Sequence, residues 1–339
     1  KTSNLEVSTY TVSGNEGTGV GSYTLTVTGT GNFAGVGTAS FNIVAKAIDA
    51  SMISGVEAEY TYTGEAIEPE VTVKDGTATL VAPTEYTVSY GANTNVGSGT
   101  VTVAGSGNYS GSVEITFVIK ALDVKLEIEL DSETLEYNGQ PQTKGIVKVT
   151  ANGLELRSDE YTVSGNVQTN AGTHTITVSG QGNFAGAAGT TTYVINAKDI
   201  AGVNFADVAT VAYTGAAHTP TPSVSNTIGT LVAGKDFTYS YASNVNAGEA
   251  TVTVTGKGNY TGTASTTFTI DPNTSELTVT LKETELTYNR SEQSVEVEEV
   301  KSGNLSVTTY TVEGLRGTDA DEYTVTVTGT GNFAGAKGT

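Results

Sequence analysis

Residues 29–35 read Gly-Thr-Gly-Asn-Phe-Ala-Gly, and the pattern Gly-x-Gly-Asn-[Phe/Tyr]-x-Gly decides how the whole chain is organised. It recurs at residues 105–111, 180–186, 256–262 and 329–335, so its first glycines lie 73 to 76 residues apart. A near-constant spacing of this size indicates tandem copies of one structural unit. Alternating Thr/Val runs precede the pattern, and further alternating runs follow its first four copies. The pattern therefore predicts a glycine-rich connection between two β-strands.

The middle of each copy is the predicted structural turn of its repeat. We expect positive φ at its second glycine, for example at Gly107 and Gly258, because β-branched residues rarely adopt that conformation. The asparagine can hydrogen-bond nearby backbone, and we expect the aromatic ring to fold back over one end of the core. The turn residues are Gly31, Asn32, Phe33, Gly107, Asn108, Tyr109, Gly182, Asn183, Phe184, Gly258, Asn259, Tyr260, Gly331, Asn332 and Phe333.

A second marker, tyrosine followed two residues later by glycine, repeats with the same period. It occurs at residues 62–64, 137–139 and 213–215, whereas residues 288–290 carry Arg290 in place of glycine, which leaves that turn uncertain at the sequence level. The last alternating strand of each unit marks its end. The predicted units are a partial repeat over 1–45, three repeats over 46–120, 121–196 and 197–271, and a partial repeat over 272–339 that lacks its last strand. We therefore expect a window from a longer array.

The units are of two kinds. Units one, three and five carry Gly-Asn-Phe-Ala-Gly, whereas units two and four carry Gly-Asn-Tyr-[Ser/Thr]-Gly. Residues 1–38 also match residues 301–338 at an offset of 300. The alternation indicates duplication of a two-unit block, and it predicts that units two and four resemble each other more closely than either resembles unit three.

The composition excludes several classes of function. The chain has 339 residues, no cysteine and a net charge of −20. Without cysteine it can form neither a disulfide nor a thiolate zinc site. A strongly acidic surface repels phosphate backbones, so we expect no nucleic-acid partner. The sequence has no run of 18 or more apolar residues, so we expect no membrane span in this segment.

We find no constellation of residues that predicts catalysis or a cofactor. The two histidines, His174 and His218, have no partner that recurs with the repeats, and we expect His174 to be a surface residue. The Gly-x-Gly-Asn pattern superficially resembles a phosphate-binding loop, but such loops open onto a helix and a strand is predicted here. The prediction is a chain that is not an enzyme and holds no cofactor.

Calcium at the joints between units is a weaker alternative. Asp123 with Asp131, or Asp199 with Asp207, could contribute carboxylate ligands there. Calcium needs several convergent oxygens, and the sequence lacks an Asp-x-Asp-x-Asp cluster. We therefore predict solvated charges and no metal site.

Two further alternatives concern lysines and threonines. Lys46, Lys120 and Lys198 recur near the joints, where a Lys–Asn cross-link would need a partner such as Asn42. The other repeats lack that asparagine, so surface lysines are the simpler interpretation. The Thr/Val alternation would also suit a face that binds ice or carbohydrate. Threonine is, however, a good strand former and a soluble outward-facing residue, which explains it without a ligand.

The predicted fold is all-β: a tandem array of small antiparallel Ig-like β-sandwich modules of about 75 residues each. The joints are short, so the modules should stack end to end in an elongated rod, on the order of 150 Å long from strand dimensions.

Residues 237–241, 246–248, 251–262 and 268–270 resemble bacterial surface Ig-like tandem repeats of the MBG type and related modules. The resemblance covers nearly the whole chain. It implies a stalk or fibre region of a large, adhesin-like extracellular protein at the bacterial surface, with no catalytic residues in such modules. The partners expected are neighbouring repeats of the same chain. The alternative is a binding module whose exposed loops engage a host glycan or protein, and lateral self-association of chains is also left open.

Overall fold

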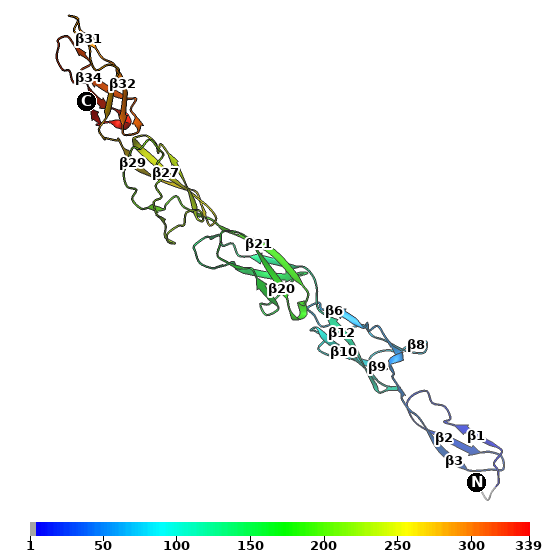
Figure 1. The fold of residues 1–339 in the computed structure, drawn as a ribbon. Coiled ribbons are helices and arrows are strands. Elements are labelled where there is room, and N and C mark those ends of the chain that lie inside the picture. Colours follow the sequence, from blue (N-terminus) through cyan, green and yellow to red (C-terminus); the bar gives the residue numbers. More distant parts are fainter. Residues whose placement is uncertain (1–4) are drawn as a thin grey trace. The chain divides into compact units, whose positions relative to one another are not determined.

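The protein is described by a computed structural model that covers residues 5–339 (Figure 1). Its regular elements are strands, and helical structure in this described part is limited to three 3-10 turns: η1 (Ala50–Met52), η2 (Gly182–Phe184) and η3 (Gly331–Phe333). No helix in the described residues is both long and apolar enough to cross a membrane. The all-β prediction is confirmed.

The chain falls into two compact units. One contains Lys1–Asp131, Ile146–Ser164 and Ile176–Thr191, and the other contains Ser132–Gly145, Gly165–Thr175 and Thr192–Thr339. The division between them passes through the third repeat. The five sequence repeats are used below as repeats one to five, with their predicted boundaries.

Repeat two is an Ig-like β-sandwich of two sheets. One sheet has the order β5-β7-β8 and the other has the order β6-β12-β10-β9. Alternation along β10 turns Val101 and Val103 inward, where they pack with Val73 of β7 in one buried cluster. The elements are β4 (Lys46–Ala47), β5 (Ile53–Ser54), β6 (Glu59–Thr61), β7 (Thr72–Asp75), β8 (Ala78–Thr79), β9 (Tyr86–Tyr90), β10 (Gly97–Gly105), β11 (Tyr109–Ser110) and β12 (Ser112–Lys120).

Repeat four repeats this plan. Its larger sheet has the order β24-β29-β27-β26, and the smaller sheet pairs β23 with β25. Val224 of β25 packs with Val254 of β27 and Phe237 of β26 in one core. The elements are β22 (Lys198–Asp199), β23 (Asn204–Phe205), β24 (Val211–Ala212), β25 (Val224–Ser225), β26 (Phe237–Ala242), β27 (Gly248–Gly256), β28 (Tyr260–Thr261) and β29 (Thr263–Asp271).

Repeat three has the sheets β13-β16-β17 and β14-β21-β20-β18, with a short β15-β19 pair. Leu126, Val149, Ile176 and Ile195 are among its fully buried side chains. The elements are β13 (Leu126–Leu130), β14 (Leu135–Glu136), β15 (Gln142–Thr143), β16 (Ile146–Ala151), β17 (Leu154–Glu155), β18 (Tyr161–Ser164), β19 (Val167–Gln168), β20 (Gly172–Gly180) and β21 (Ala188–Asn196).

Repeats five and one are smaller. Repeat five has the sheets β30-β32-β33 and β34-β36-β37 and the pair β31-β35, whereas repeat one has the single sheet β1-β2-β3. The elements of repeat five are β30 (Thr278–Leu281), β31 (Gln293–Ser294), β32 (Val297–Ser302), β33 (Leu305–Ser306), β34 (Tyr310–Glu313), β35 (Arg316–Gly317), β36 (Thr326–Gly329) and β37 (Lys337–Gly338). Those of repeat one are β1 (Tyr10–Ser13), β2 (Gly21–Gly29) and β3 (Val36–Ile43).

The long strands pair antiparallel, as predicted, and short parallel pairings add to them. In repeats two, three and four the last long strand runs parallel to an early short strand: β12 with β6, β21 with β14, and β29 with β24. Parallel partners need a long crossover connection, and almost the whole repeat lies between these two strands. The alternation of apolar and polar residues shows which face of the sheet each side chain occupies. It does not show which strand lies next to which, so it cannot reveal such a pairing.

The two kinds of repeat differ at the glycine pattern. In repeats two and four the Tyr-[Ser/Thr] pair forms a short parallel bridge with the joint, β11 with β4 and β28 with β22. In repeats three and five the Asn-Phe pair closes a 3-10 turn instead, η2 or η3. In repeats two to five the difference between Tyr-[Ser/Thr] and Phe-Ala therefore corresponds to a difference in backbone structure, whereas repeat one has Phe-Ala without a 3-10 turn.

Candidate functional site: the junction between repeats

The glycine pattern joins each repeat to the one before it. Its asparagine was expected to bond nearby backbone, but the structure places the side chain against the preceding repeat. In three junctions the asparagine Oδ1 accepts a backbone N–H at 2.8–2.9 Å, and its Nδ2 donates to a second asparagine at 2.9–3.0 Å. We call this arrangement the asparagine clamp. Each clamp described here lies within one compact unit.

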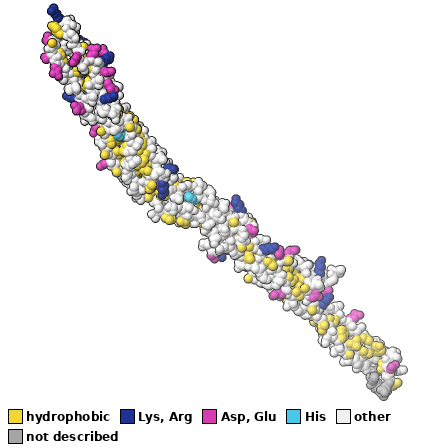
Figure 2. Space-filling view, in the orientation of Figure 1, with side chains coloured by type: hydrophobic (Ala, Val, Ile, Leu, Met, Phe, Trp, Pro, Cys, Tyr) yellow, Lys and Arg dark blue, Asp and Glu magenta, His cyan; other side chains and the backbone are white. Residues whose placement is uncertain are grey.

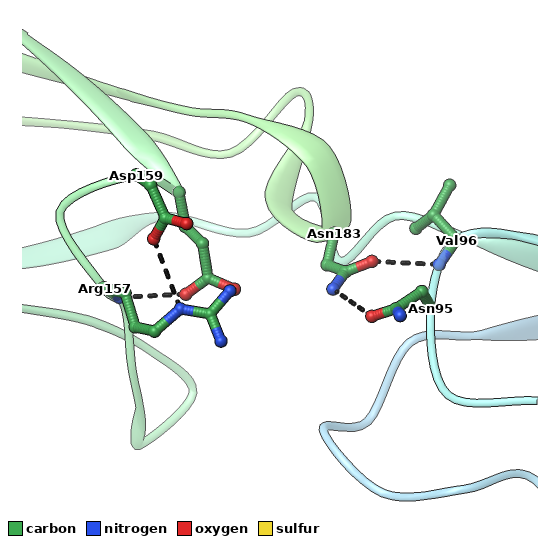
Figure 3. A network of polar contacts seen from close by, with 6 residues as sticks. Asn95, Val96, Arg157, Asp159 and Asn183 are labelled. Carbon is green, nitrogen blue, oxygen red and sulfur yellow. Dashed lines mark hydrogen bonds and ion pairs between the residues drawn. The ribbon is translucent and has the colours of Figure 1, made fainter. Parts of the chain in front are cut away.

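The clamp between repeats two and three shows the geometry (Figure 3). Val96 donates its backbone N–H to Asn183 Oδ1 at 2.9 Å, and Asn183 Nδ2 donates to Asn95 Oδ1 at 2.9 Å. The Arg157–Asp159 ion pair in the same figure belongs to repeat three, and no hydrogen bond drawn there connects it to the clamp. The asparagine thus uses both functional groups of its amide at once, one as acceptor and one as donor.

The same clamp recurs at the next two junctions. Asn259 binds the N–H of Ala171 and the side chain of Asn170, and Asn332 binds Ala247 and Asn246. At the first junction Asn108 accepts the N–H of Val20 at 2.8 Å. Gly19 stands there in place of the second asparagine, so that junction keeps only the acceptor half of the clamp.

The aromatic residue of the pattern meets the tyrosine of the second sequence marker across the same junction. Phe184 packs edge-on against Tyr62 of the preceding repeat, with ring centroids 5.4 Å apart. Tyr260 meets Tyr137 at 5.4 Å, and Phe333 meets Tyr213 at 5.3 Å. Edge-to-face geometry is the favoured arrangement of aromatic pairs. The ring therefore closes one end of its own core, as predicted, and also contacts the repeat before it.

The glycine of the second marker makes room for a neighbour. A side chain on Gly64, Gly139 or Gly215 would point at an aliphatic side chain of the following repeat, and at Gly139 its Cβ would lie 2.8 Å from Ile228 Cγ2. All three glycines have positive φ. Arg290, which occupies the equivalent position of repeat five, keeps this conformation with φ of +69°, so the turn survives the substitution.

Backbone bonds at the joints complete the junction. The carbonyl groups of Asn108, Asn183 and Asn259 accept an N–H from the start of their own repeat, at 2.9–3.0 Å. The donors are Lys46, Leu122 and Lys198. One asparagine therefore fixes the joint through its carbonyl group and the preceding repeat through its side chain.

The two glycines of the pattern have different roles. Gly107 and Gly258 have φ of +63° and +66°, as expected for the second glycine. The first glycine has an ordinary φ, but no side chain would fit at its position. A Cβ on Gly180 would lie 2.2 Å from the carbonyl oxygen of Phe184. The chain folds back over this glycine to bring the aromatic ring into the core. The sequence pattern predicted positive φ at the second glycine. It did not predict the close approach of the first glycine to the carbonyl oxygen of the aromatic residue.

The histidines do not form a site. His174 is partly exposed; its ring lies 5.6 Å from that of Tyr193, and its Nε2 lies 2.8 Å from the carbonyl oxygen of Asn170. His218 lies in another repeat, where Thr214 Oγ1 is 3.3 Å from its Nε2. Neither arrangement places a nucleophile beside a base that a carboxylate orients.

The carboxylates and lysines near the joints form local contacts. Asp199 accepts the backbone N–H of Ala201 at 2.9 Å, and among the described residues no group of three or more His, Cys, Asp and Glu side chains could hold a metal ion. Lys46 pairs with Asp75, Lys120 with Glu59, and Lys198 with Glu136. The three lysines thus have acidic partners, not the asparagine that a cross-link would need.

The pair of Lys46 and Asp75 predicts how repeat two responds to pH. The hydrogen bond from Lys46 lowers the pKa of Asp75, and Asp75 raises the pKa of Lys46 in turn. A lowered carboxylate pKa stabilises the fold above its unfolded value, about 4, and this contribution is lost as pH falls through the folded value. A raised lysine pKa stabilises the fold below about 10.5 and is lost at higher pH.

We therefore expect the contribution of this pair to the urea midpoint of repeat two to be constant between these limits and to fall on both sides. Asp75→Asn should flatten the acidic side relative to the unmodified chain, because it removes the titrating carboxylate. Glu114→Gln is the control, since that exposed carboxylate of β12 lies outside the Lys46–Asp75 pair. Equal acid dependence of the midpoint in Asp75→Asn and the unmodified chain would contradict the assignment.

No protein-family model and no curated protein matches the chain. Among solved structures, the extracellular domain of protocadherin gammaB4 matches with 14% identity and a TM-score of 0.20, covering 94% of this chain and 71% of that chain. The eight N-terminal Ig domains of Down syndrome cell adhesion molecule isoform 1.30.30 match with 11% identity and a TM-score of 0.17, covering 91% of this chain and 56% of that chain. At these scores the likeness carries no argument, and the fold assignment rests on the strands described above.

Proposed function

We propose that the chain is a structural stalk or fibre region of an adhesin-like protein exposed at a bacterial surface. The observation that carries the proposal is the recurrent junction: the same asparagine clamp and the same edge-on aromatic pair hold three successive pairs of repeats. A repeat array in which each unit contacts its neighbours through one standard junction is suited to a mechanical role.

The surface is compatible with this role. The chain carries a net charge of −20, and Figure 2 shows acidic and basic side chains interspersed on the face in view. A net charge far from zero keeps proteins soluble and opposes association. The bacterial and extracellular assignment is supported by the resemblance to MBG-type repeats. The alternative function, loops that bind a host glycan or protein, stays a prediction.

The clamp would act by limiting rotation between repeats. The amide of one asparagine bonds a backbone N–H and a side chain of the neighbour, while its own carbonyl holds the joint. Two directional bonds from one planar group define an orientation more closely than apolar contact alone. The aromatic pair beside it supplies the buried contact.

Small-angle scattering tests the proposal. We expect a radius of gyration near 43 Å, the value for a thin rod of roughly 150 Å, against about 20 Å for a compact globule of this length. The triple variant Asn183→Ala/Asn259→Ala/Asn332→Ala removes the clamp amides and should broaden the distance distribution, because the repeats can then reorient. The double variant Thr116→Ala/Thr267→Ala, at exposed positions in the middle of β12 and β29, should match the unmodified chain. A radius near the compact value would overturn the stalk proposal.

A further inference from the structure

Strand β26 forms one edge of the larger sheet of repeat four. All six of its residues, Phe237–Ala242, pair with β27, and the sheet order β24-β29-β27-β26 places no strand on its other side. An open edge of this kind presents main-chain groups that a strand of another molecule can bind. The question is which groups are available and what kind of strand they fit.

The hydrogen bonds next to β26 show which of its main-chain groups face outward. Lys257, beside β27, donates its N–H to the carbonyl oxygen of Asp236. In an antiparallel ladder every second residue bonds to the same neighbour. Residues 236, 238, 240 and 242 therefore face β27, whereas the main-chain groups of residues 237, 239 and 241 point away from the sheet.

Two of the three outward-facing residues keep their main-chain groups available. The carbonyl oxygen of Phe237 accepts the N–H of Gly234 at 2.8 Å, so a loop of the same repeat occupies it. For Tyr239 and Tyr241 the part of the chain that the structure describes, residues 5–339, supplies no main-chain partner on the outer side. The edge therefore offers two N–H groups and two C=O groups.

The edge β26 lacks the charges that usually prevent edge-to-edge pairing. It reads Phe-Thr-Tyr-Ser-Tyr-Ala, with neither a charged residue nor a proline. At the equivalent edge of repeat two, burial and then the charges of Glu68 and Glu70 raise the pKa of Tyr90, so these carboxylates lie close to β9. Repeat four has the exposed, neutral residues Thr219 and Thr221 at the corresponding positions.

Repeat four as a whole is also close to neutral. It contains three lysines and five carboxylates, for a net charge of −2, whereas repeats two, three and five have net charges of −6, −5 and −6. Like net charge opposes association. Of the repeats that have two sheets, repeat four is therefore the one where two copies of this acidic chain approach each other with the least repulsion.

The available groups of β26 match those of a second β26 in antiparallel orientation. With Ser240 opposite Ser240 of the second copy, Tyr239 lies opposite Tyr241 of the second copy, and the reverse pair follows by symmetry. Each pair exchanges two N–H···O bonds, so all four available groups on both copies are satisfied. The tyrosine hydroxyls already donate to the carbonyl oxygens of Pro222 and Pro220, which holds β26 in place for pairing.

We propose that β26 of repeat four pairs with β26 of a second copy of the chain, antiparallel about a two-fold axis at Ser240. The two four-stranded sheets then form one eight-stranded sheet. Each strand ends at Ala242 and thus opposite Thr238 of the other copy, before the loop at Gly234. A two-fold contact uses the same surface on both copies and closes on itself, so the product is a dimer and not an open aggregate.

A cysteine at the two-fold axis tests the pairing, because the chain has no cysteine of its own. Residues that face each other at a non-hydrogen-bonded position have Cα atoms about 4.5 Å apart, which a disulfide can span. Under mild oxidation the full chain with Ser240→Cys should form a disulfide-linked dimer on a non-reducing gel. Ser89→Cys, at the equivalent exposed position of β9, is the matched control and should cross-link at least about tenfold more slowly.

Sedimentation equilibrium tests the pairing without a covalent bond. The apparent mass of the unmodified chain should rise with concentration towards twice the mass of one chain. Ser240→Lys places like charges opposite each other and should weaken dimerisation at least about tenfold, whereas Ser89→Lys should not. An equimolar mixture of Ser240→Lys and Ser240→Asp should associate more strongly than either variant alone, because opposite charges then face each other.

Three results would overturn the proposal. Equal cross-linking of Ser240→Cys and Ser89→Cys removes the assignment to β26. A mass of one chain at every concentration of the unmodified protein removes the pairing itself. A mixture that associates no better than its components excludes the register with Ser240 on the axis. The pairing goes beyond the stalk proposal and is independent of it, since none of these results changes the radius of gyration expected for a single chain.

Discussion

Replacing Phe184 by alanine should lower the free energy of unfolding by about 3–5 kcal/mol, the usual cost of removing a buried phenylalanine ring. The ring is only 2% exposed and touches Tyr62 of the preceding repeat. The substitution therefore removes core packing in repeat three and the aromatic contact of a junction together. Chemical denaturation followed by tyrosine fluorescence measures the loss.

Two further variants divide this loss between core and junction. Val194→Ala removes an exposed side chain from the neighbouring strand β21 and should cost little. A double-mutant cycle with Tyr62→Ala isolates the ring pair, for which we expect a coupling of about 0.5–1.5 kcal/mol. Zero coupling would show that the two rings are adjacent without stabilising the junction.

The first and second glycines of the pattern should respond differently to the same substitution. Gly180→Ala forces a Cβ to within 2.2 Å of the carbonyl oxygen of Phe184, so the turn itself must move. We expect a cost of about 1–3 kcal/mol or more, as for overpacked cores. Gly182→Ala places a methyl group in open space but keeps φ at +57°, which should cost about 1 kcal/mol.

Thermal melting of the two variants side by side measures the difference. Gly258→Val extends the series, because a β-branched residue at φ of +66° should cost about 1 kcal/mol or more. An unchanged melting temperature in Gly258→Val would refute the role of positive φ. Equal losses in Gly180→Ala and Gly182→Ala would contradict the close approach of the first glycine.

The sequence predicted the repeats and their strands because both leave periodic signals. The alternation of Thr and Val marks β10 and its equivalents, and the glycine pattern marks the turn that follows. Glycine at the second position of the pattern indicated positive φ there. The phenylalanine or tyrosine indicated a ring that folds into the core. These are local properties, and the residues that indicate them recur in each repeat.

The junction could not be predicted in the same way. Asn183 and Asn95 lie 88 positions apart, and neither residue type specifies its partner. A signal was nevertheless present, since asparagine precedes the apolar residue at Asn95, Asn170 and Asn246 with the same period as the glycine pattern. The parallel pairing of β12 with β6 left no such signal, because alternation is the same in parallel and antiparallel strands.

One of the two bonds of the asparagine clamp is made to the backbone of the neighbouring repeat. The N–H that it binds belongs to Val96 in one junction and to alanine in the next two, so the contact is indifferent to the side chain at that position. Each of the three central repeats also carries both halves of the contact. Gain or loss of a whole repeat through recombination would then leave the clamp intact at the new boundary. If the proposed stalk function holds, a gene built in this way would change the length of its product in steps of one repeat, without a compensating mutation in the clamp.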